Sequence, residues 1–390
     1  MNRPIPLFTP RFFLMCGLTF TVFLSAFQLL PTAPFRIIDQ GGSTFAAGLF
    51  LGFLTYSSAL SAPFTGAFGD RFGKRRMLLV CSLVLAGFTA SYAFIPGYRL
   101  LLVLVVAQGV FWSGLLSASS AYMTDFIPEG RRAEGIGYWG MSTMLAVAAA
   151  PSLGFFVYRQ GWGALCAVTS VLNLLMAGIA WTLPEETHAT AGFLRAPLTL
   201  RSLVEWRVVA VSLSLFLVSF GYGGITSFVA LFADRSGINP RGIYFTTFAT
   251  VVLVTRPFMG RLADRVGHRH FVLPCFVLAG LGFALLAAST SRAQMVGAAV
   301  VFDLGFGNLY PAFVAHVVKH VDPGRRGAAF GGILAAFDTG IGTGSIALGA
   351  LIERHGFAVA YAAAAALAAL ALPVFLYAER RFLSRSASQN

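Results

Sequence analysis

Three charged residues stand inside long apolar stretches of the second half of the chain: Arg256, Asp303 and Asp338. A charge in the hydrocarbon core of a membrane costs about 2.5–3.5 kcal/mol even on scales derived from insertion experiments. A carboxyl group at such a position can bind and release a proton, and a carboxylate or a guanidinium group can recognise a charged solute. The alternative is a purely structural network of ion pairs.

The spacing of these charges along their segments predicts which of them meet. At a helical rise of about 1.5 Å per residue, Arg256 lies closer in height to Asp338 than to Asp303. We therefore expect Arg256 to contact Asp338. Asp303 would then lack a cationic partner and could take up and release a proton. Coupling to an ion, or recognition of the charge on a ligand, is accordingly expected in the second half.

The composition decides which elements must position these residues. Of the 390 residues, 57% are hydrophobic and only 11% are charged, against about 25% charged in soluble domains. A water-soluble fold is excluded, and a bilayer is the expected solvent. The net charge of +13 does not indicate nucleic-acid binding, because the basic residues are scattered between apolar stretches. The four cysteines show no metal-ligand or redox spacing, so we expect no metal site.

A membrane-spanning helix needs about 20 mainly apolar residues, and twelve segments satisfy this requirement. They are 12–31, 45–68, 77–95, 99–123, 134–157, 161–182, 207–233, 241–262, 271–290, 294–317, 327–352 and 357–378. A polar linker at 184–206 separates the first six from the last six. The sequence therefore predicts an all-α membrane protein with one half at 1–183 and another at 207–390.

The distribution of basic residues predicts the orientation. If both termini lie on the same side of the membrane, most of the 28 Lys and Arg residues fall in the termini and in the loops on that side. Lys and Arg are retained on the cytoplasmic side. We expect a multi-pass protein of the cell inner membrane with both termini in the cytoplasm.

A short motif occurs in both halves. Two glycines, an acid and a base recur at a constant offset: Gly66, Asp70, Arg71 and Gly73 return as Gly260, Asp264, Arg265 and Gly267. The second glycine of each copy allows a tight turn. The same offset of 194 residues relates Arg131 to Arg325. The loop after the second and the eighth segment resembles the signature loop of the major facilitator superfamily. The resemblance covers essentially the whole chain.

This resemblance implies a fold of twelve transmembrane helices in two pseudo-symmetric six-helix bundles, with a solute site between them. It also implies a cytoplasmic latch, in which Asp70 faces Arg325 and Asp264 faces Arg131. Such contacts would hold the cytoplasmic side shut. The alternative is that these charges only fix the topology by staying in the cytoplasm.

In this family the first, fourth, seventh and tenth helices line the cavity, so their polar and aromatic residues become candidates for solute binding. These are Gln28, Gln108, Trp112, Ser113, Tyr222, Thr226, Asn308 and Tyr310. The alternative is hydrogen bonding between neighbouring helices. Two histidines near the end of the tenth segment, His316 and His320, could relay protons, but we expect them to be solvated.

The fifth segment partly resembles the Gly-Pro motif of the drug and proton antiporters, through Gly137, Pro151 and Gly154. The fourth segment departs from that group, because Val105 stands where a buried arginine belongs. Coupling would then have moved to the charges of the second half.

These features predict a secondary active transporter, not an enzyme, that exports a small organic solute by alternating access and proton antiport. An importer or facilitator of a metabolite such as an organic acid or sugar is the alternative. We expect a monomer in the lipid bilayer with protons as the coupling ion, no other cofactor and no nucleic-acid partner.

Overall fold

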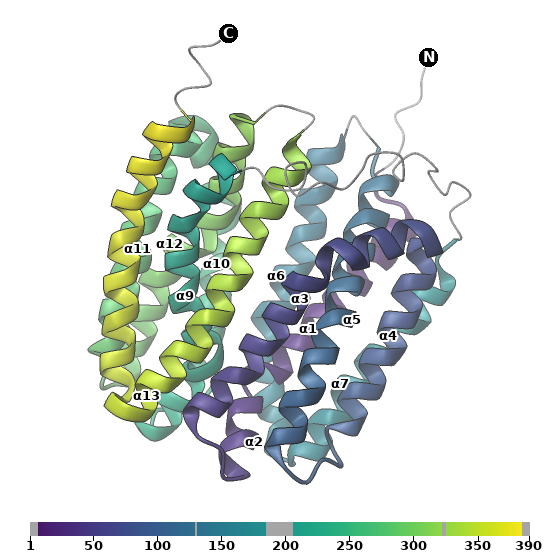
Figure 1. Cartoon of the computed structure of the whole chain (residues 1–390), viewed down its shortest axis with the longest axis horizontal. Coiled ribbons are helices and arrows are strands. Elements are labelled where there is room, and N and C mark those ends of the chain that lie inside the picture. The colour runs from purple at the N-terminus through teal and green to yellow at the C-terminus, as the bar shows by residue number, and fades with distance from the viewer. Residues whose placement is uncertain (1–6, 129–130, 185–205, 322–324, 384–390) are drawn as a thin grey trace. The chain divides into compact units, whose positions relative to one another are not determined.

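The computed structural model describes residues 7–128, 131–184, 206–321 and 325–383, and their regular elements are all helices (Figure 1). The helices are α1 (Pro10–Leu29), α2 (Ala33–Asp39), α3 (Thr44–Phe72), α4 (Lys74–Ser91), α5 (Tyr98–Phe126), α6 (Arg132–Tyr158), α7 (Trp162–Thr182), α9 (Trp206–Arg235), α10 (Ile243–Val266), α11 (His268–Ala287), α12 (Arg292–Lys319), α13 (Arg326–Ala378) and η4 (Glu379–Leu383). The all-α prediction is confirmed. The predicted linker lies almost entirely outside the described residues.

Each of the twelve predicted segments overlaps a helix, but the count of spans differs. Among the described residues, nine helices are long and apolar enough to cross a membrane, or ten if the two bent segments of α10 form one span. Two predicted spans merge in α13, which is interrupted by a non-helical Gly356 with φ 83°. Helix α4 is not among the nine, since it opens with the basic run 74–76. Twelve spans therefore stay a prediction.

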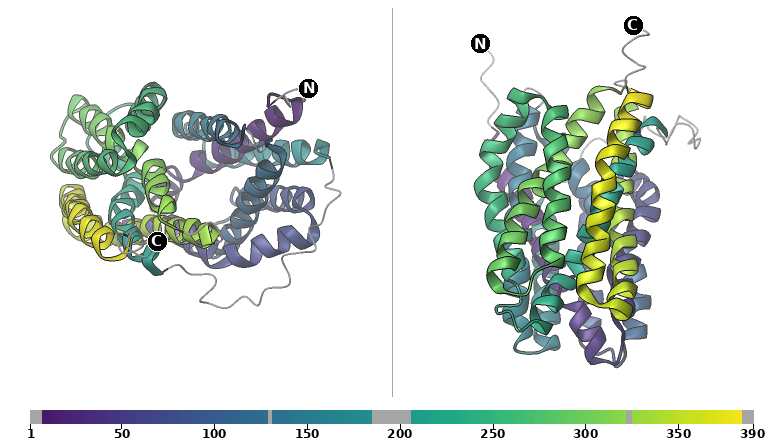
Figure 2. Two further views of the ribbon diagram at one scale, coloured as in Figure 1. Left: turned by 90° about the horizontal axis from the view of Figure 1, so that it is seen from above. Right: turned by 90° about the vertical axis from the view of Figure 1, so that its left-hand side faces the viewer.

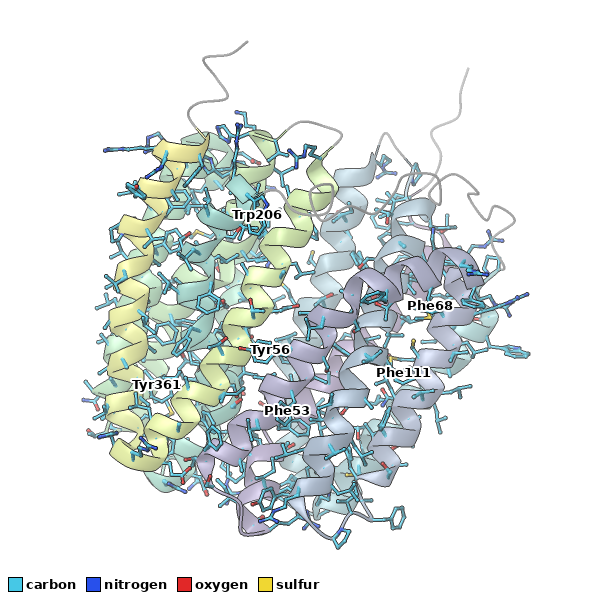
Figure 3. All side chains as sticks on the ribbon, viewed as in Figure 1. Phe53, Tyr56, Phe68, Phe111, Trp206 and Tyr361 are labelled. Atoms are coloured by element: carbon cyan, nitrogen blue, oxygen red, sulfur yellow. The ribbon has the colours of Figure 1, made fainter. Side chains whose placement is uncertain are left out.

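Large apolar side chains lie on the outside of the helices. Phe68 is 52% exposed and Trp206 is 65% exposed, and both are labelled in Figure 3. A monomeric soluble protein rarely exposes so many side chains of this kind. The described outer surface is thus apolar, as expected for a surface in contact with the lipid chains of a membrane.

The contacts divide the chain into two compact units. Unit 1 holds Met1–Arg36 and Tyr56–Phe193, and unit 2 holds Ile37–Thr55 and Leu194–Asn390. This division differs from the halves predicted at 1–183 and 207–390, because the segment 37–55 packs within unit 2. Helix α3 therefore begins in unit 2 and ends in unit 1.

The core of unit 1 joins α1, α4 and α5 through buried apolar side chains such as Met15, Leu18, Cys81 and Leu115. Small polar residues tie α4 to α7: the Thr89 and Ser170 hydroxyls are hydrogen bonded at 2.9 Å. Hydrogen bonds between hydroxyl groups on neighbouring helices are a common way to hold helices together in lipid.

In unit 2, α13 packs against α9 and α11, and α11 packs against α12 (Figure 2). The contact with α9 brings backbone against backbone: a Cβ built at Gly344 would overlap the carbonyl oxygen of Phe220, and one at Gly223 would overlap that of Ile341. Only glycine permits such an approach. These glycines set the distance between α9 and α13.

The first part of α3 packs closely on α13 in the same manner. A Cβ at Gly48 would overlap the carbonyl oxygen of Ser345. Two hydroxyls add hydrogen bonds to backbone carbonyls: Thr44 donates to Gly349 at 2.9 Å, and Ser345 donates to Gly48 at 3.0 Å. We call this packing of 44–55 on 342–353 the glycine clasp. It explains why 37–55 groups with unit 2.

Candidate functional site

The buried acid Asp303 is the centre of the candidate site in unit 2. Its side chain lies on α12 at 0% exposure, and neither carboxyl oxygen has a hydrogen-bond partner among the described residues. Arg256 on α10 is close enough to interact electrostatically with Asp303, yet its Nη1 is also without a partner in the described part of the chain. The two groups therefore lie near each other without a hydrogen bond between them.

The expectation that Arg256 meets Asp338 is wrong for this structure. Arg256 interacts with Asp303, whereas half-buried Asp338 on α13 interacts electrostatically with Tyr310 on α12. Heights along straight helices do not give the direction in which a side chain points. Helix α10 packs against α12, and its two segments meet at 56° directly after Arg256. This packing and this bend place the guanidinium beside α12.

Aromatic rings surround the acid. Tyr222 on α9 stacks on Phe306 of α12 with ring centroids 4.4 Å apart. Tyr222 and Tyr244 both interact electrostatically with Asp303, and the Tyr244 hydroxyl is buried without a hydrogen-bond partner among the described residues. Gly307 leaves room for the carboxyl group, since a Cβ there would overlap Asp303 Oδ1. Helices α9, α10 and α12 therefore converge on one unsatisfied polar cluster.

Tyr244 was not among the predicted site residues. It stands second in α10, at the end of a segment, where a tyrosine is ordinarily read as an interfacial anchor. Its 0% exposure and its interaction with Asp303 appear only once α10 is packed on α12.

The predicted cavity residues of unit 1 are mostly engaged in local hydrogen bonds. Gln108 accepts a hydrogen bond from the Tyr92 hydroxyl, and the hydroxyls of Ser113 and Thr65 are 3.1 Å apart. Gln28 differs, because its side-chain oxygen is buried without a partner among the described residues.

Three further predicted cavity residues, two in unit 2 and one in unit 1, lie against neighbours. In unit 2, Thr226 donates to the Tyr222 carbonyl at 2.9 Å, and the Asn308 amide donates to Leu304 at 3.5 Å. In unit 1, the Trp112 ring lies 5.8 Å from that of Phe23. Solute binding by these residues stays a prediction.

The repeated loops place their glycines as expected for tight turns. Gly73 has φ 91° and Gly267 has φ 85°, at the starts of α4 and α11. A residue other than glycine is rarely stable at such angles. Asp264 is exposed and its Oδ1 lies 3.9 Å from His268 Nε2, while the side chain of Asp70 lies outside the described residues. The latch to Arg131 and Arg325 stays a prediction.

Another basic residue of each loop anchors a helix end in its own unit. In unit 1, Arg75 Nη2 donates to the Trp181 carbonyl at 2.6 Å, at the end of α7. In unit 2, Arg269 Nε donates to both carboxyl oxygens of Glu379, at 2.9 and 3.0 Å, after the end of α13. The two arginines share the repeat offset. The recurrence of these two arginines in the repeat was therefore a signal for a shared role, but the sequence did not indicate that they bind Trp181 and Glu379.

The expectation that His316 is solvated is also wrong. Its Nε2 lies 2.8 Å from Glu379 Oε1, and both side chains are largely buried. Nδ1 of His320 lies 2.8 Å from the His316 carbonyl oxygen. Glu379 joins the ends of α11, α12 and α13, and it lies 63 positions from His316 in the sequence. His316 is buried because it pairs with Glu379, and the spacing of the two residues in the sequence did not indicate this contact.

We expect Glu379→Gln to destabilise unit 2, because Arg269 and His316 would lose the carboxylate between them. Removing one partner of a buried ion pair costs about 3–5 kcal/mol, and the 39% exposure of Arg269 reduces this to about 2 kcal/mol. Thermal unfolding of the purified chain measures the loss. A double-mutant cycle with Arg269→Gln measures the interaction between Arg269 and Glu379. If the losses of stability from the two single substitutions add up to the loss in the double variant, the direct contact is contradicted.

Comparisons with known proteins agree with this architecture. The family model of the Major Facilitator Superfamily matches residues 15–244 and 211–390. The chain is 27% identical over 346 residues to the uncharacterized MFS-type transporter YhhS of Escherichia coli K12, covering 85% of this chain and 83% of that protein.

Solved structures show the same fold at low identity. A bacterial homolog of the human lysosomal transporter Spinster, in an inward-facing and unoccupied conformation, has a TM-score of 0.75 at 18% identity over 98% of this chain and 99% of that one. The nucleoside transporter NupG has a TM-score of 0.72 at 16% identity over 95% and 99%. With the family model matched along almost the whole sequence, the chain belongs to the Major Facilitator Superfamily of transporters.

Proposed function

We propose that this chain exports a small organic solute in exchange for protons, with Asp303 as the proton carrier. The supporting observation is a fully buried carboxyl group with no hydrogen-bond partner among the described residues. Burying an unpaired ionised carboxylate is costly, so such a group tends to be neutral. The guanidinium of Arg256 is near enough to interact electrostatically with this carboxyl group. A modest change in its surroundings would therefore be enough for the Asp303 carboxyl group to bind or release a proton.

Alternating access would supply that change of surroundings. The glycine clasp holds the first part of α3 on α13, and the backbone NH of Phe45 donates to Glu353 at its end, at 3.1 Å. With both termini in the cytoplasm, as the basic residues favour, this end of α3 faces the periplasm. We infer that the clasp closes the periplasmic side and parts when the carrier opens outward.

The direction of transport is inferred from α6. The partial Gly-Pro pattern of α6, through Gly137, Pro151 and Gly154, favours export. Import of an organic acid is the second candidate, because Arg256 Nη1 is buried without a partner in the described residues and could bind a carboxylate. Overexpression in cells separates the two. Export lowers accumulation of the solute and import raises it.

Proton coupling is tested in proteoliposomes. A thermal-shift screen of the purified chain first supplies a solute, and its flux is then measured with an imposed pH gradient. Asp303→Asn cannot ionise and should reduce gradient-driven flux to the level of protein-free liposomes. Asp234→Asn is the matched control, because Asp234 is paired with Arg241 at 2.6 Å at the end of α9. Unchanged gradient-driven flux in Asp303→Asn would exclude Asp303 as the carrier.

A further inference from the structure

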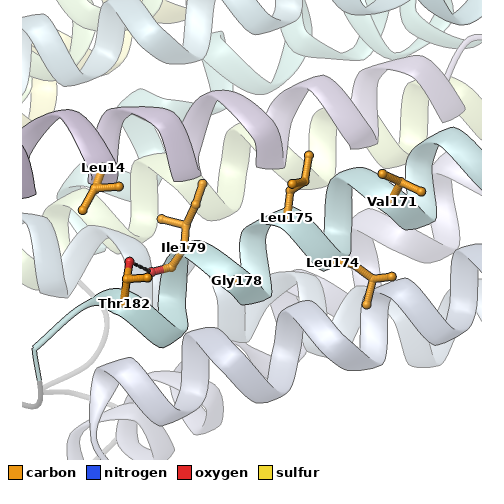
Figure 4. A pocket seen from close by; sticks show the side chains of 7 residues that line it. All are labelled: Leu14, Val171, Leu174, Leu175, Gly178, Ile179 and Thr182. Carbon is orange, nitrogen blue, oxygen red and sulfur yellow. Dashed lines mark hydrogen bonds between the residues drawn. The ribbon is translucent and has the colours of Figure 1, made fainter.

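A groove on unit 1 runs between α1 and α7 (Figure 4). It has a volume of about 410 Å³, and it is lined by Leu14 of α1 and by α7 from Val171 to Thr182. Its side chains are apolar except for Thr182, whose hydroxyl donates to the Ile179 carbonyl at 2.8 Å. A polar solute would find no free hydrogen-bonding side chain on these walls. The groove therefore fits a hydrocarbon chain.

The groove is open on its outer side. Leu174 and Leu175 are 52% and 54% exposed. Gly178 contributes to its depth, since a Cβ built there meets no described atom within 4 Å apart from its chain neighbours and the backbone of its own helix. In a membrane protein the medium on such a surface is lipid. An acyl chain can enter this groove from the side.

One end of the groove carries positive charge. Arg75 donates to the carbonyls of Ala180 and Trp181, at 3.4 and 2.6 Å, directly beside Thr182. These bonds use two of the five N–H donors of the guanidinium, so donors remain for an anion. Arg11 is exposed one helical turn before Leu14, on the other wall. Two cations thus flank the end of an apolar groove.

We propose that this groove binds a phospholipid with an anionic headgroup, with one acyl chain along α7 and the phosphate between Arg11 and Arg75. The charge complementarity selects the headgroup, and the apolar walls select the chain. Basic pockets between transmembrane helices bind such headgroups on the cytoplasmic side. The exposed Trp181 ring, 5.9 Å from the Arg75 guanidinium, marks the level of the interface.

Native mass spectrometry of the delipidated chain tests this site. The first molecule of dioleoylphosphatidylglycerol should bind at least about tenfold more tightly than dioleoylphosphatidylcholine. Gly178→Leu fills the groove without a steric clash and should weaken phosphatidylglycerol binding about tenfold, which corresponds to the loss of two buried CH₂ groups. Gly163→Leu is the matched control, because it lies on the same helix, outside the groove, with open space around its Cβ.

A second variant examines the headgroup separately. Arg11→Gln leaves the groove intact and should bring the affinity for phosphatidylglycerol close to that for phosphatidylcholine. Equal binding of the two lipids by the unmodified chain would overturn the anionic selectivity. Unchanged phosphatidylglycerol binding in both Gly178→Leu and Arg11→Gln would overturn the site itself.

Discussion

Replacing Gly48 with tryptophan is expected to part α3 from α13 at the glycine clasp. The Cβ alone would overlap the Ser345 carbonyl oxygen, which is backbone and cannot move aside as a side chain does. Overpacking of this kind costs about 1–3 kcal/mol. If the open arrangement has no such overlap, the ratio of open to closed carriers should rise about 5- to 150-fold.

Spin labels at two exposed positions of unit 2, Phe45 and His355, measure this shift by double electron-electron resonance. The population with the longer distance should dominate in Gly48→Trp. Gly87→Trp is the control, because a Cβ at that position of α4 meets no described atom within 4 Å apart from its chain neighbours and the backbone of its own helix. A distance distribution in Gly48→Trp that matches the unmodified chain would show that the clasp does not open.

Replacing Gly344 with leucine should prevent stable packing of unit 2. Its Cβ would overlap the Phe220 carbonyl oxygen on α9, so the two helices would have to separate along their contact. Losses above about 4 kcal/mol are expected where a substitution forces backbones apart in a core. Monodispersity and thermal unfolding of the purified chain measure the effect.

Gly331→Leu provides the comparison within the same helix. Gly331 lies on α13, and a Cβ built there meets no described atom within 4 Å apart from its chain neighbours and the backbone of its own helix. Its substitution should change stability by no more than about 0.5 kcal/mol. Similar unfolding temperatures for Gly344→Leu and Gly331→Leu would contradict the close approach of α9 and α13.

The features that follow from local pattern could be predicted from the sequence. Long apolar segments predicted the helices, and the repeated loops predicted the turn glycines Gly73 and Gly267, whose positive φ the structure confirms. The family followed from the same loops. These predictions depend on the type of residue and its position along the chain, and sequence provides both.

The features that depend on packing could not be predicted. The partner of Arg256 depends on the bend in α10 and on the direction of its side chain, and spacing gives only its height. The burial of His316 depends on Glu379, which comes from a different helix. The grouping of 37–55 with unit 2 depends on glycines about 300 positions away. Each of these requires contacts between distant segments.

The central claim is that protonation of Asp303 controls the opening of the carrier. Double electron-electron resonance between labels at Phe45 and His355 tests it most directly, with the chain in lipid nanodiscs across a range of pH and without added solute. We predict two distances whose ratio changes with pH, and we predict that Asp303→Asn resembles the low-pH state at every pH. A ratio that keeps its full pH dependence in Asp303→Asn would contradict this account.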